Sequence, residues 1–194
     1  MPWRRRCLTL LGLAMLATSW GATELAARGR TVTFAADYPR GTIIVINNER
    51  RLYFVLGDGK ALRYRVAVGN RSELWTGRTF VSAKRKNPSW TPVDGGETVR
   101  GGLSRNPLGK RALYLDWSLL RIHGTPSRGS VGRAVSNGCI RMLNEDVIDL
   151  YDRVHIGAPV IAVNARRHLD RFLEPVVSGK LPARTDQTAR RRGR

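Results

Sequence analysis

The chain has 194 residues, of which 42% are hydrophobic and 25% charged, and this composition is that of a folded soluble protein rather than a disordered one. Its length favours one domain with tails. The formal net charge of +19 and the pI near 11.4 indicate an anionic surface nearby, although charge alone does not identify that surface.

Residues 1–27 have the layout of a secretory signal peptide. Three arginines precede an apolar run over residues 7–17, and small residues follow as far as Ala27. The apolar run is shorter than the roughly 20 residues that a membrane-spanning helix needs. We therefore predict export to the periplasm or cell envelope, cleavage between Ser19 and Ala27, and no stable membrane span after cleavage.

Export would leave the mature chain with one thiol. Cys7 departs with the leader, so Cys139 has no disulfide partner. A solitary thiol in an oxidising compartment is open to oxidation and mixed disulfides, which favours a use for it. A buried, inert cysteine is the commoner fate of a free thiol, and the neighbouring residues must decide between the two readings.

Short apolar and β-branched runs, separated by Asn-Asn and Gly-Asp-Gly turns, predict a mostly antiparallel β domain. The many glycines, prolines and polar residues of 69–110 predict long loops laid over a sheet. His123 follows the fifth predicted strand directly. The strands expected up to this point are residues 42–46, 51–56, 62–68, 112–115 and 119–122.

One helix of about three turns is expected after Cys139. Asn144 is its predicted N-cap, acidic residues fill its first turn, and it should end before Gly157. Residues 159–163 then return as a strand. The tail from Leu181 lacks apolar periodicity and ends in a basic cluster, which predicts disorder. The apolar stripe expected on the helix consists of Val147, Ile148, Tyr151 and Val154.

Neither a metal ion nor a cofactor is indicated. The single mature cysteine and the scattered histidines lack metal-ligand spacing, and no glycine-rich phosphate loop is present. His155 and His168 have no catalytic context and are expected at the surface or at helix ends.

Cys139 and His123 form the candidate catalytic pair. A thiol nucleophile needs a base or an imidazolium, because its ordinary pKa leaves only a few per cent ionised at neutral pH. His123 lies sixteen positions upstream, and the intervening loop contains four glycines and one proline, so it can fold back. Gly138 permits close approach of a substrate, and the amides around the cysteine could form an oxyanion hole.

The segments "IHG", "SNGCIRM" and "NEDVIDLYDRVHIGAPVIAV" resemble, in this order, the catalytic segment of the L,D-transpeptidase (YkuD-type) family of cell-wall enzymes. The resemblance covers residues 41–164. It implies a mainly β fold, a YkuD-like β-sandwich with a short helix after the catalytic cysteine. It also implies a cysteine that attacks the third residue of a peptidoglycan tetrapeptide stem, usually meso-diaminopimelate, and releases D-alanine. An amine acceptor then resolves the acyl-enzyme.

The resemblance assigns Cys139 as nucleophile and His123 as base, with the backbone of Gly124 orienting the imidazole. Arg141 follows the cysteine by two positions and could bind a stem carboxylate, or it could be one more charge on a basic surface. The residues expected to bind substrate or to form the oxyanion hole are Ser136, Asn137, Gly138, Arg141 and Gly124.

The chain departs from the family pattern at two places. Asn137 stands where the family has a histidine, so we expect it to hydrogen-bond and not to transfer protons. The usual Thr-Pro-x-Gly segment is replaced by "WTGRTF", which keeps Thr76 but loses the prolines. Activity is still expected, because nucleophile and base are both present.

Three segments are therefore predicted: a signal peptide (1–27), the catalytic domain (41–164), and a C-terminal extension with a basic disordered tail (165–194). The expected partners are peptidoglycan stem peptides, with an outer-membrane protein as a second candidate acceptor and no nucleic acid. An L,D-carboxypeptidase of the same fold and a non-catalytic, basic envelope-binding protein stay open as alternatives. Papain-like endopeptidases and sortases are disfavoured by the order and spacing of cysteine and histidine.

Overall fold

The structure, a computed structural model, describes residues 29–35, 37–116 and 119–173. The predicted leader and the tail from Leu181 lie outside this range. None of the helices in the described ranges combines the length and the apolar character that crossing a bilayer requires.

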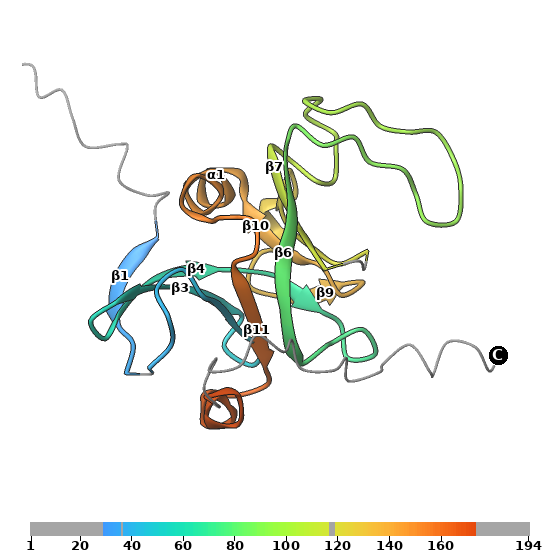
Figure 1. Ribbon diagram of the computed structural model, residues 1–194. Coiled ribbons are helices and arrows are strands. Elements are labelled where there is room, and N and C mark those ends of the chain that lie inside the picture. The colour runs from blue at the N-terminus through green and yellow to red at the C-terminus, as the bar shows by residue number, and fades with distance from the viewer. Residues whose placement is uncertain (1–28, 36, 117–118, 174–194) are drawn as a thin grey trace, which may run out of the picture.

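Nine strands form one continuous sheet in the order β1-β4-β3-β2-β11-β6-β7-β8-β10 (Figure 1), and β5 pairs with β9 separately. The sheet folds on itself, and the larger core cluster fills the space between its two halves. This arrangement is the predicted β-sandwich. The strands are β1 (Arg30–Thr33), β2 (Ile43–Ile46), β3 (Arg51–Gly57), β4 (Lys60–Arg65), β5 (Val68–Gly69), β6 (Gly77–Lys86), β7 (Arg111–Leu115), β8 (Arg121–Thr125), β9 (Ala134–Ser136), β10 (Ile140–Leu143) and β11 (Pro159–Val163).

The strands β2 and β11 lie side by side in parallel near the middle of the sheet. Both are continuous apolar runs, because both of their faces are covered. One face of this pair packs into the core between the sheet halves, and the other packs against Phe34, Tyr38 and Leu169. Since Phe34 and Leu169 lie outside residues 41–164, the packed unit extends beyond the predicted domain at both ends.

The predicted antiparallel meander is confirmed for β2, β3 and β4. The third predicted run divides, however. Its ladder with β3 ends at Arg65, and Val68 begins the short strand β5, which pairs in parallel with Ala134 of β9. The chain changes partners at this point and thereby anchors the loop that leads to Cys139.

The prediction of long loops over residues 69–110 is wrong for ten of these residues, which form β6. This strand pairs with β11 through Gly77–Phe80 and with β7 through Val81–Lys86, so it joins both halves of the sheet, as Figure 1 shows. Only Val81 in it is fully buried, and five of its residues are arginine, lysine or glycine. A strand with so little apolar periodicity is recognisable only from its two neighbours.

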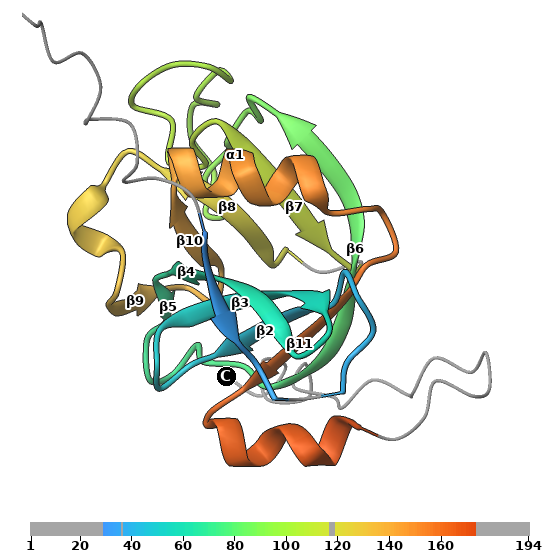
Figure 2. The same cartoon turned by 90° about the vertical axis from the view of Figure 1, so that its left-hand side faces the viewer.

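The helix α1 (Asn144–Arg153) confirms the single predicted helix, and it packs on β7 and β8 (Figure 2). Asn144 is not its N-cap; Leu143 takes that position and makes no side-chain cap. The Asn144 side chain is used elsewhere, since its Oδ1 accepts from the Lys110 amide at 2.9 Å. The buried stripe contains Val147, Leu150 and Val154, while Ile148 and Tyr151 are half-buried.

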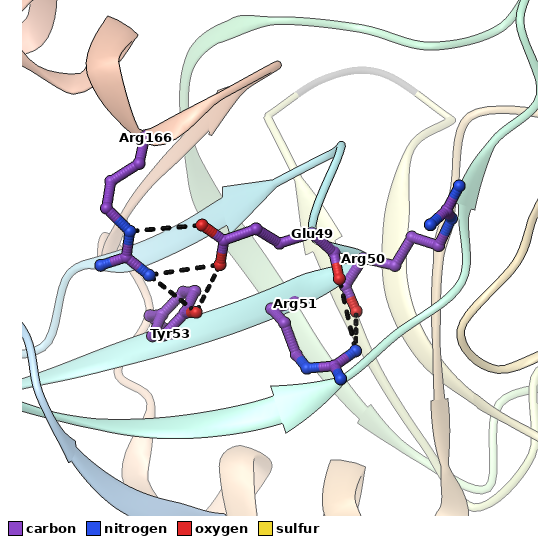
Figure 3. Close-up of polar contacts among 5 residues, drawn as sticks. All are labelled: Glu49, Arg50, Arg51, Tyr53 and Arg166. Carbon is purple, nitrogen blue, oxygen red and sulfur yellow. Dashed lines mark hydrogen bonds and ion pairs between the residues drawn. The ribbon is translucent and has the colours of Figure 1, made fainter.

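On the opposite side of the molecule from α1, the 3₁₀ helix η2 (Arg166–Phe172) covers the outer face of the sheet (Figure 2). Arg166 holds it there (Figure 3): the guanidinium donates to both carboxylate oxygens of Glu49 at 3.2 Å and to the Tyr53 hydroxyl at 2.9 Å. It also lies 5.1 Å from the ring centre of Phe34. The described part of the predicted C-terminal extension therefore belongs to the fold.

The carboxyl group of Asp146 in the first turn of α1 gives a pH-dependent term in stability. Burial, together with Glu145 and Asp149, raises its pKa from 3.8 to about 6. The unfolded chain ionises this group first, so ionisation destabilises the fold progressively from about pH 4 to pH 6 and fully above that. The helix dipole offsets part of this cost.

We expect Asp146→Asn to raise the free energy of unfolding at pH 7.5 by about 1 kcal/mol, after discounting for partial exposure. At pH 3 the gain should largely vanish, because Asp146 is then mostly protonated in both states. Urea denaturation at the two pH values measures the difference. Asp152→Asn, which removes an exposed charge from the same helix, is the matched control, and an equal gain in both variants would contradict the role of burial.

Candidate active site

Strands β8 and β10 lie side by side in parallel, and their register brings the two ends of the candidate motif together. Ile140 pairs with Ile122, and Arg141 pairs with His123. Cys139 immediately precedes β10, so continuing the register by one residue sets it beside Arg121. Because side chains alternate along a strand, Cys139, Arg121 and His123 share a face. Strand spacing then separates the Cα atoms of Cys139 and His123 by about 8 Å, within reach of an imidazole.

His123 is buried, with 4% of its surface exposed, and its ring is oriented by the backbone. Its Nδ1 lies 2.6 Å from the Gly124 carbonyl oxygen. A carbonyl can only accept, so Nδ1 carries the proton and Nε2 keeps a free lone pair. Burial lowers the pKa of this imidazole to about 4, and the charges of Arg141 and Arg121 act in the same direction, against the opposing hydrogen bond to Gly124. His123 is therefore a neutral base at physiological pH.

The turn before Cys139 is fixed by contacts from two directions. Ser136 Oγ donates to the carbonyl of Cys139 at 2.5 Å, and Trp75 Nε1 donates to the carbonyl of Gly138 at 2.9 Å. Gly138 has a φ of +97°, and a Cβ there would come within 2.9 Å of Leu120. The position requires glycine on both grounds. Trp75 was not predicted, because its contact spans 63 residues.

The thiol of Cys139 is half-buried and free. Its Sγ donates a long hydrogen bond, 3.8 Å, to the carbonyl of Leu119. A thiol that reaches a surface loop is accessible to a ligand, unlike the inert core cysteine that was the alternative reading.

Two arginines flank the pair on this face. The backbone of Arg141 bonds to Ala67 in both directions, at 2.8 and 3.0 Å, which fixes its Cα position. Arg121 stacks over Tyr114, and its Nε is buried with no hydrogen-bond partner in the described residues. Sequence reasoning found Arg141 but missed Arg121, although its place two residues before His123 on the same strand face could have indicated it.

Asn144 is a third residue whose role the sequence did not reveal. Its Oδ1 accepts from the Lys110 amide, and its Nδ2 donates to the Thr125 carbonyl at 3.4 Å. A Cβ on Gly124 would lie 2.3 Å from that Oδ1. Asn144 thus packs directly on the peptide whose carbonyl orients His123, and Gly124 has to be glycine for this packing.

Asn137 is exposed and lies apart from these contacts. Ser136 and Trp75 hold the cysteine turn, whereas the Asn137 side chain lines a cleft of about 500 Å³ with Trp90, Pro92, Val93 and Asp94. The cleft therefore begins two residues before the thiol. In the described ranges, no group of three or more histidine, cysteine, aspartate or glutamate side chains could hold a metal ion.

Comparison with known proteins identifies the family. Residues 41–161 match the model of the L,D-transpeptidase catalytic domain, YkuD. The chain belongs to the L,D-transpeptidase family. This is a family of cysteine-dependent enzymes of the cell envelope, and the matched range includes both His123 and Cys139. The predicted membership and the predicted fold class are both confirmed.

Relatives extend the match. The chain is 32% identical to the putative L,D-transpeptidase YqjB of Bacillus subtilis over 141 residues, which cover 69% of this chain and 78% of YqjB. It is 30% identical to the probable L,D-transpeptidase YcfS of Escherichia coli over 176 residues, which cover 78% of this chain and 55% of YcfS. This chain thus spans about half the length of YcfS.

Solved L,D-transpeptidase structures share the fold. An L,D-transpeptidase from Mycobacterium tuberculosis superposes with a TM-score of 0.54 at 19% identity, over 64% of this chain and 58% of that one. The catalytic domain of the Enterococcus faecium L,D-transpeptidase gives 0.52 at 19% identity, over 66% of this chain and all of that domain.

The ring of His123 should titrate far below an ordinary histidine. We expect its NMR signals, identified by their loss in His123→Gln, to move with a midpoint near pH 4, because protonation would bury a charge beside two arginines. Arg141→Gln, which removes one neighbouring charge, should raise this midpoint. A midpoint near 6.5 in the unmodified protein would contradict the burial argument.

Proposed function

We propose that this chain is an exported L,D-transpeptidase that forms an acyl-enzyme on Cys139 with a peptidoglycan tetrapeptide stem and transfers it to an amine. The observation that supports the proposal is the parallel register of β8 and β10, which puts Cys139 and His123 on one strand face, together with the Nδ1 hydrogen bond to Gly124 that leaves Nε2 of His123 unprotonated. Family membership supplies the reaction class. Loss of the leader at residues 1–27 and activity in the periplasm are part of the proposal.

Acylation starts with the His123 imidazole in its neutral form. As Sγ of Cys139 attacks the carbonyl carbon of the third stem residue, its proton passes to Nε2 of His123, and the carbonyl oxygen takes the negative charge. The amides of Gly138 and Cys139 are the proposed donors to that oxygen. When the tetrahedral intermediate collapses, the C–N bond breaks, and the departing D-alanine amine takes the proton from His123. A thioester on Cys139 remains.

Deacylation repeats these steps with a new amine. Its nitrogen attacks the thioester carbon, its proton passes to Nε2, and the thiolate leaves and regains a proton from the imidazolium. The Nδ1 hydrogen bond to Gly124 stays in place throughout and keeps the tautomer fixed. Asn137 lacks a titrating group, so His123 is the only proton carrier in this scheme.

Arg141 and Arg121 suit the recognition of the donor stem, whose carboxylates must be brought to the thiol. No carboxylate lies within ion-pair distance of either guanidinium in the described residues. An unpaired guanidinium beside a nucleophile binds a substrate carboxylate with charge-assisted hydrogen bonds.

Covalent capture tests the nucleophile. Related structures include one L,D-transpeptidase in complex with imipenem and one acylated by ertapenem. We expect intact-mass spectrometry to show one carbapenem adduct on this protein. Cys139→Ser and Cys139→Ala should stay folded, form no adduct and release no D-alanine from a tetrapeptide stem. Either an adduct on Cys139→Ala or most of the turnover retained by Cys139→Ser would mean that another residue reacts. Unaltered binding of anionic wall polymer by these variants, with no turnover in the wild type, would instead support the non-catalytic alternative.

The role of His123 as general base is tested by the rate of acylation. His123→Ala should slow acylation of Cys139 on the order of 100-fold, the usual loss for a general base. In the wild type, the rate should stay level from pH 8 down to about pH 5, because the imidazole remains neutral over that range. His155→Ala, which removes an exposed histidine, is the matched control. Identical pH profiles of thiol alkylation in wild type and His123→Ala would overturn the pairing.

A further inference from the structure

The cleft beside Asn137 has features that the nucleophile and the base do not explain. Four of the five residues that line its volume of about 500 Å³ come from one short segment, residues 90–94, and the fifth is Asn137. One wall of the cleft is therefore continuous with the cysteine turn, and the opposite wall belongs to the long loop between β6 and β7. Figure 1 shows this loop, in green to yellow, standing out from the body.

The opposite wall is a hairpin with a fixed base. Trp90 and Val99 exchange backbone hydrogen bonds of 3.0 and 2.8 Å, and the hydroxyls of Thr91 and Thr98 lie 2.8 Å apart. Below them the buried amide of Asn106 donates to the carbonyls of Pro88, Val99 and Arg100 at 2.9, 3.2 and 3.2 Å. The base is thus anchored by a buried side chain, and the segment that rises from it, residues 90–94, lines the cleft.

The lining combines an apolar surface with one negative charge. Val93 leaves 84% of its surface exposed, and Trp90 and Pro92 are half-exposed beside it. Such a surface accommodates a methylene chain, and an indole face also attracts an ammonium group. Asp94 is the carboxylate at this surface. The ion pairs formed within the described ranges engage Glu49, Glu145 and Asp149, and none of them engages Asp94.

The negative charge of Asp94 is unusual in a chain that is predominantly basic. The chain has 34 lysine and arginine residues but only 15 aspartate and glutamate residues. Two arginines, Arg121 and Arg141, flank Cys139 and His123 on their strand face. The site therefore has two chemically different sides: a cationic side on β8 and β10, and an anionic, partly apolar side on the hairpin.

We propose that the cleft is the acceptor subsite, that it binds an aliphatic chain ending in an ammonium group, and that Asp94 is its specificity-determining residue. The proposal rests on the proposed function, since it concerns the second half of the same reaction. A stem carboxylate is attracted by the arginines and repelled by Asp94, whereas an acceptor ammonium has the opposite preference. On attack, the ammonium has lost one proton to solvent, and the attacking amine gives its second to Nε2 of His123.

The test compares two nucleophiles on a preformed acyl-enzyme. Nα-acetyl-lysine amide carries an aliphatic ammonium, and hydroxylamine is a small amine that is uncharged at neutral pH. We expect Asp94→Asn to raise KM for acetyl-lysine amide about 3- to 5-fold, the effect of one exposed charge pair. Interception by hydroxylamine should not change. The difference between wild type and variant should shrink at 1 M salt, where the screening length is about 3 Å.

Two further variants sharpen the comparison. Glu97→Gln removes the other carboxylate of the hairpin, which does not line the cleft, and should behave as wild type. Asp94→Glu restores the charge and should recover most of the affinity. An unchanged KM in Asp94→Asn, or an equal loss with both nucleophiles, would overturn the proposal.

A binding measurement separates this inference from the reaction itself. Titrating acetyl-lysine amide into Cys139→Ala should shift the NMR signal of the Trp90 indole, and Asp94→Asn in the same background should weaken that shift. If the wild type formed no acyl-enzyme, the proposed function would fail while this titration still tested the cleft. No perturbation of Trp90 at saturating amine would overturn the acceptor subsite.

Discussion

The parallel pairing of β8 with β10 is the constraint on which the candidate site depends. Parallel neighbours need a crossover, and here the crossover is residues 126–139, with the 3₁₀ turn η1 (Arg128–Ser130) and strand β9 inside it. The crossover is anchored where β9 pairs with β5 and where Ser136 bonds to the carbonyl of Cys139. A slip of one residue in the β8–β10 register would turn the thiol and the imidazole to opposite faces.

Burial of His123 determines what kind of catalytic pair this register creates. A pre-formed thiolate–imidazolium pair needs a histidine that protonates readily, and burial beside two arginines opposes that. The resting imidazole is therefore neutral, and it becomes charged only as the substrate carbonyl is attacked.

Local patterns in the sequence were enough to predict the central strands, α1 and the cysteine–histidine pair. Continuous apolar runs identify β2 and β11, and the glycine before Cys139 indicates its turn. Features that depend on distant partners could not be read in this way. β6 has little apolar periodicity because it is shared between two half-sheets, and Trp75 reaches Gly138 across 63 residues. Asn144 has a typical capping side chain, yet it serves Lys110 and Thr125, since tertiary hydrogen bonds outcompete the local cap.

Net charge and local charge have different consequences for such an enzyme. Without residues 1–27, which contain three arginines and one glutamate, the formal charge of +19 becomes +17, and it draws the protein toward anionic wall material and favours encounter with carboxylate-bearing stems. The same field opposes the approach of a cationic acceptor. At physiological ionic strength, however, exposed charges are largely screened beyond about 8 Å, so the lysines and arginines elsewhere on the surface count for little inside the cleft. Within that distance the nearest fixed charges decide, and at the hairpin the cleft is lined by the carboxylate of Asp94. A protein with a large net positive charge can therefore bind an anionic donor on one side of its nucleophile and a cationic acceptor on the other, provided that an acidic residue lines the acceptor side.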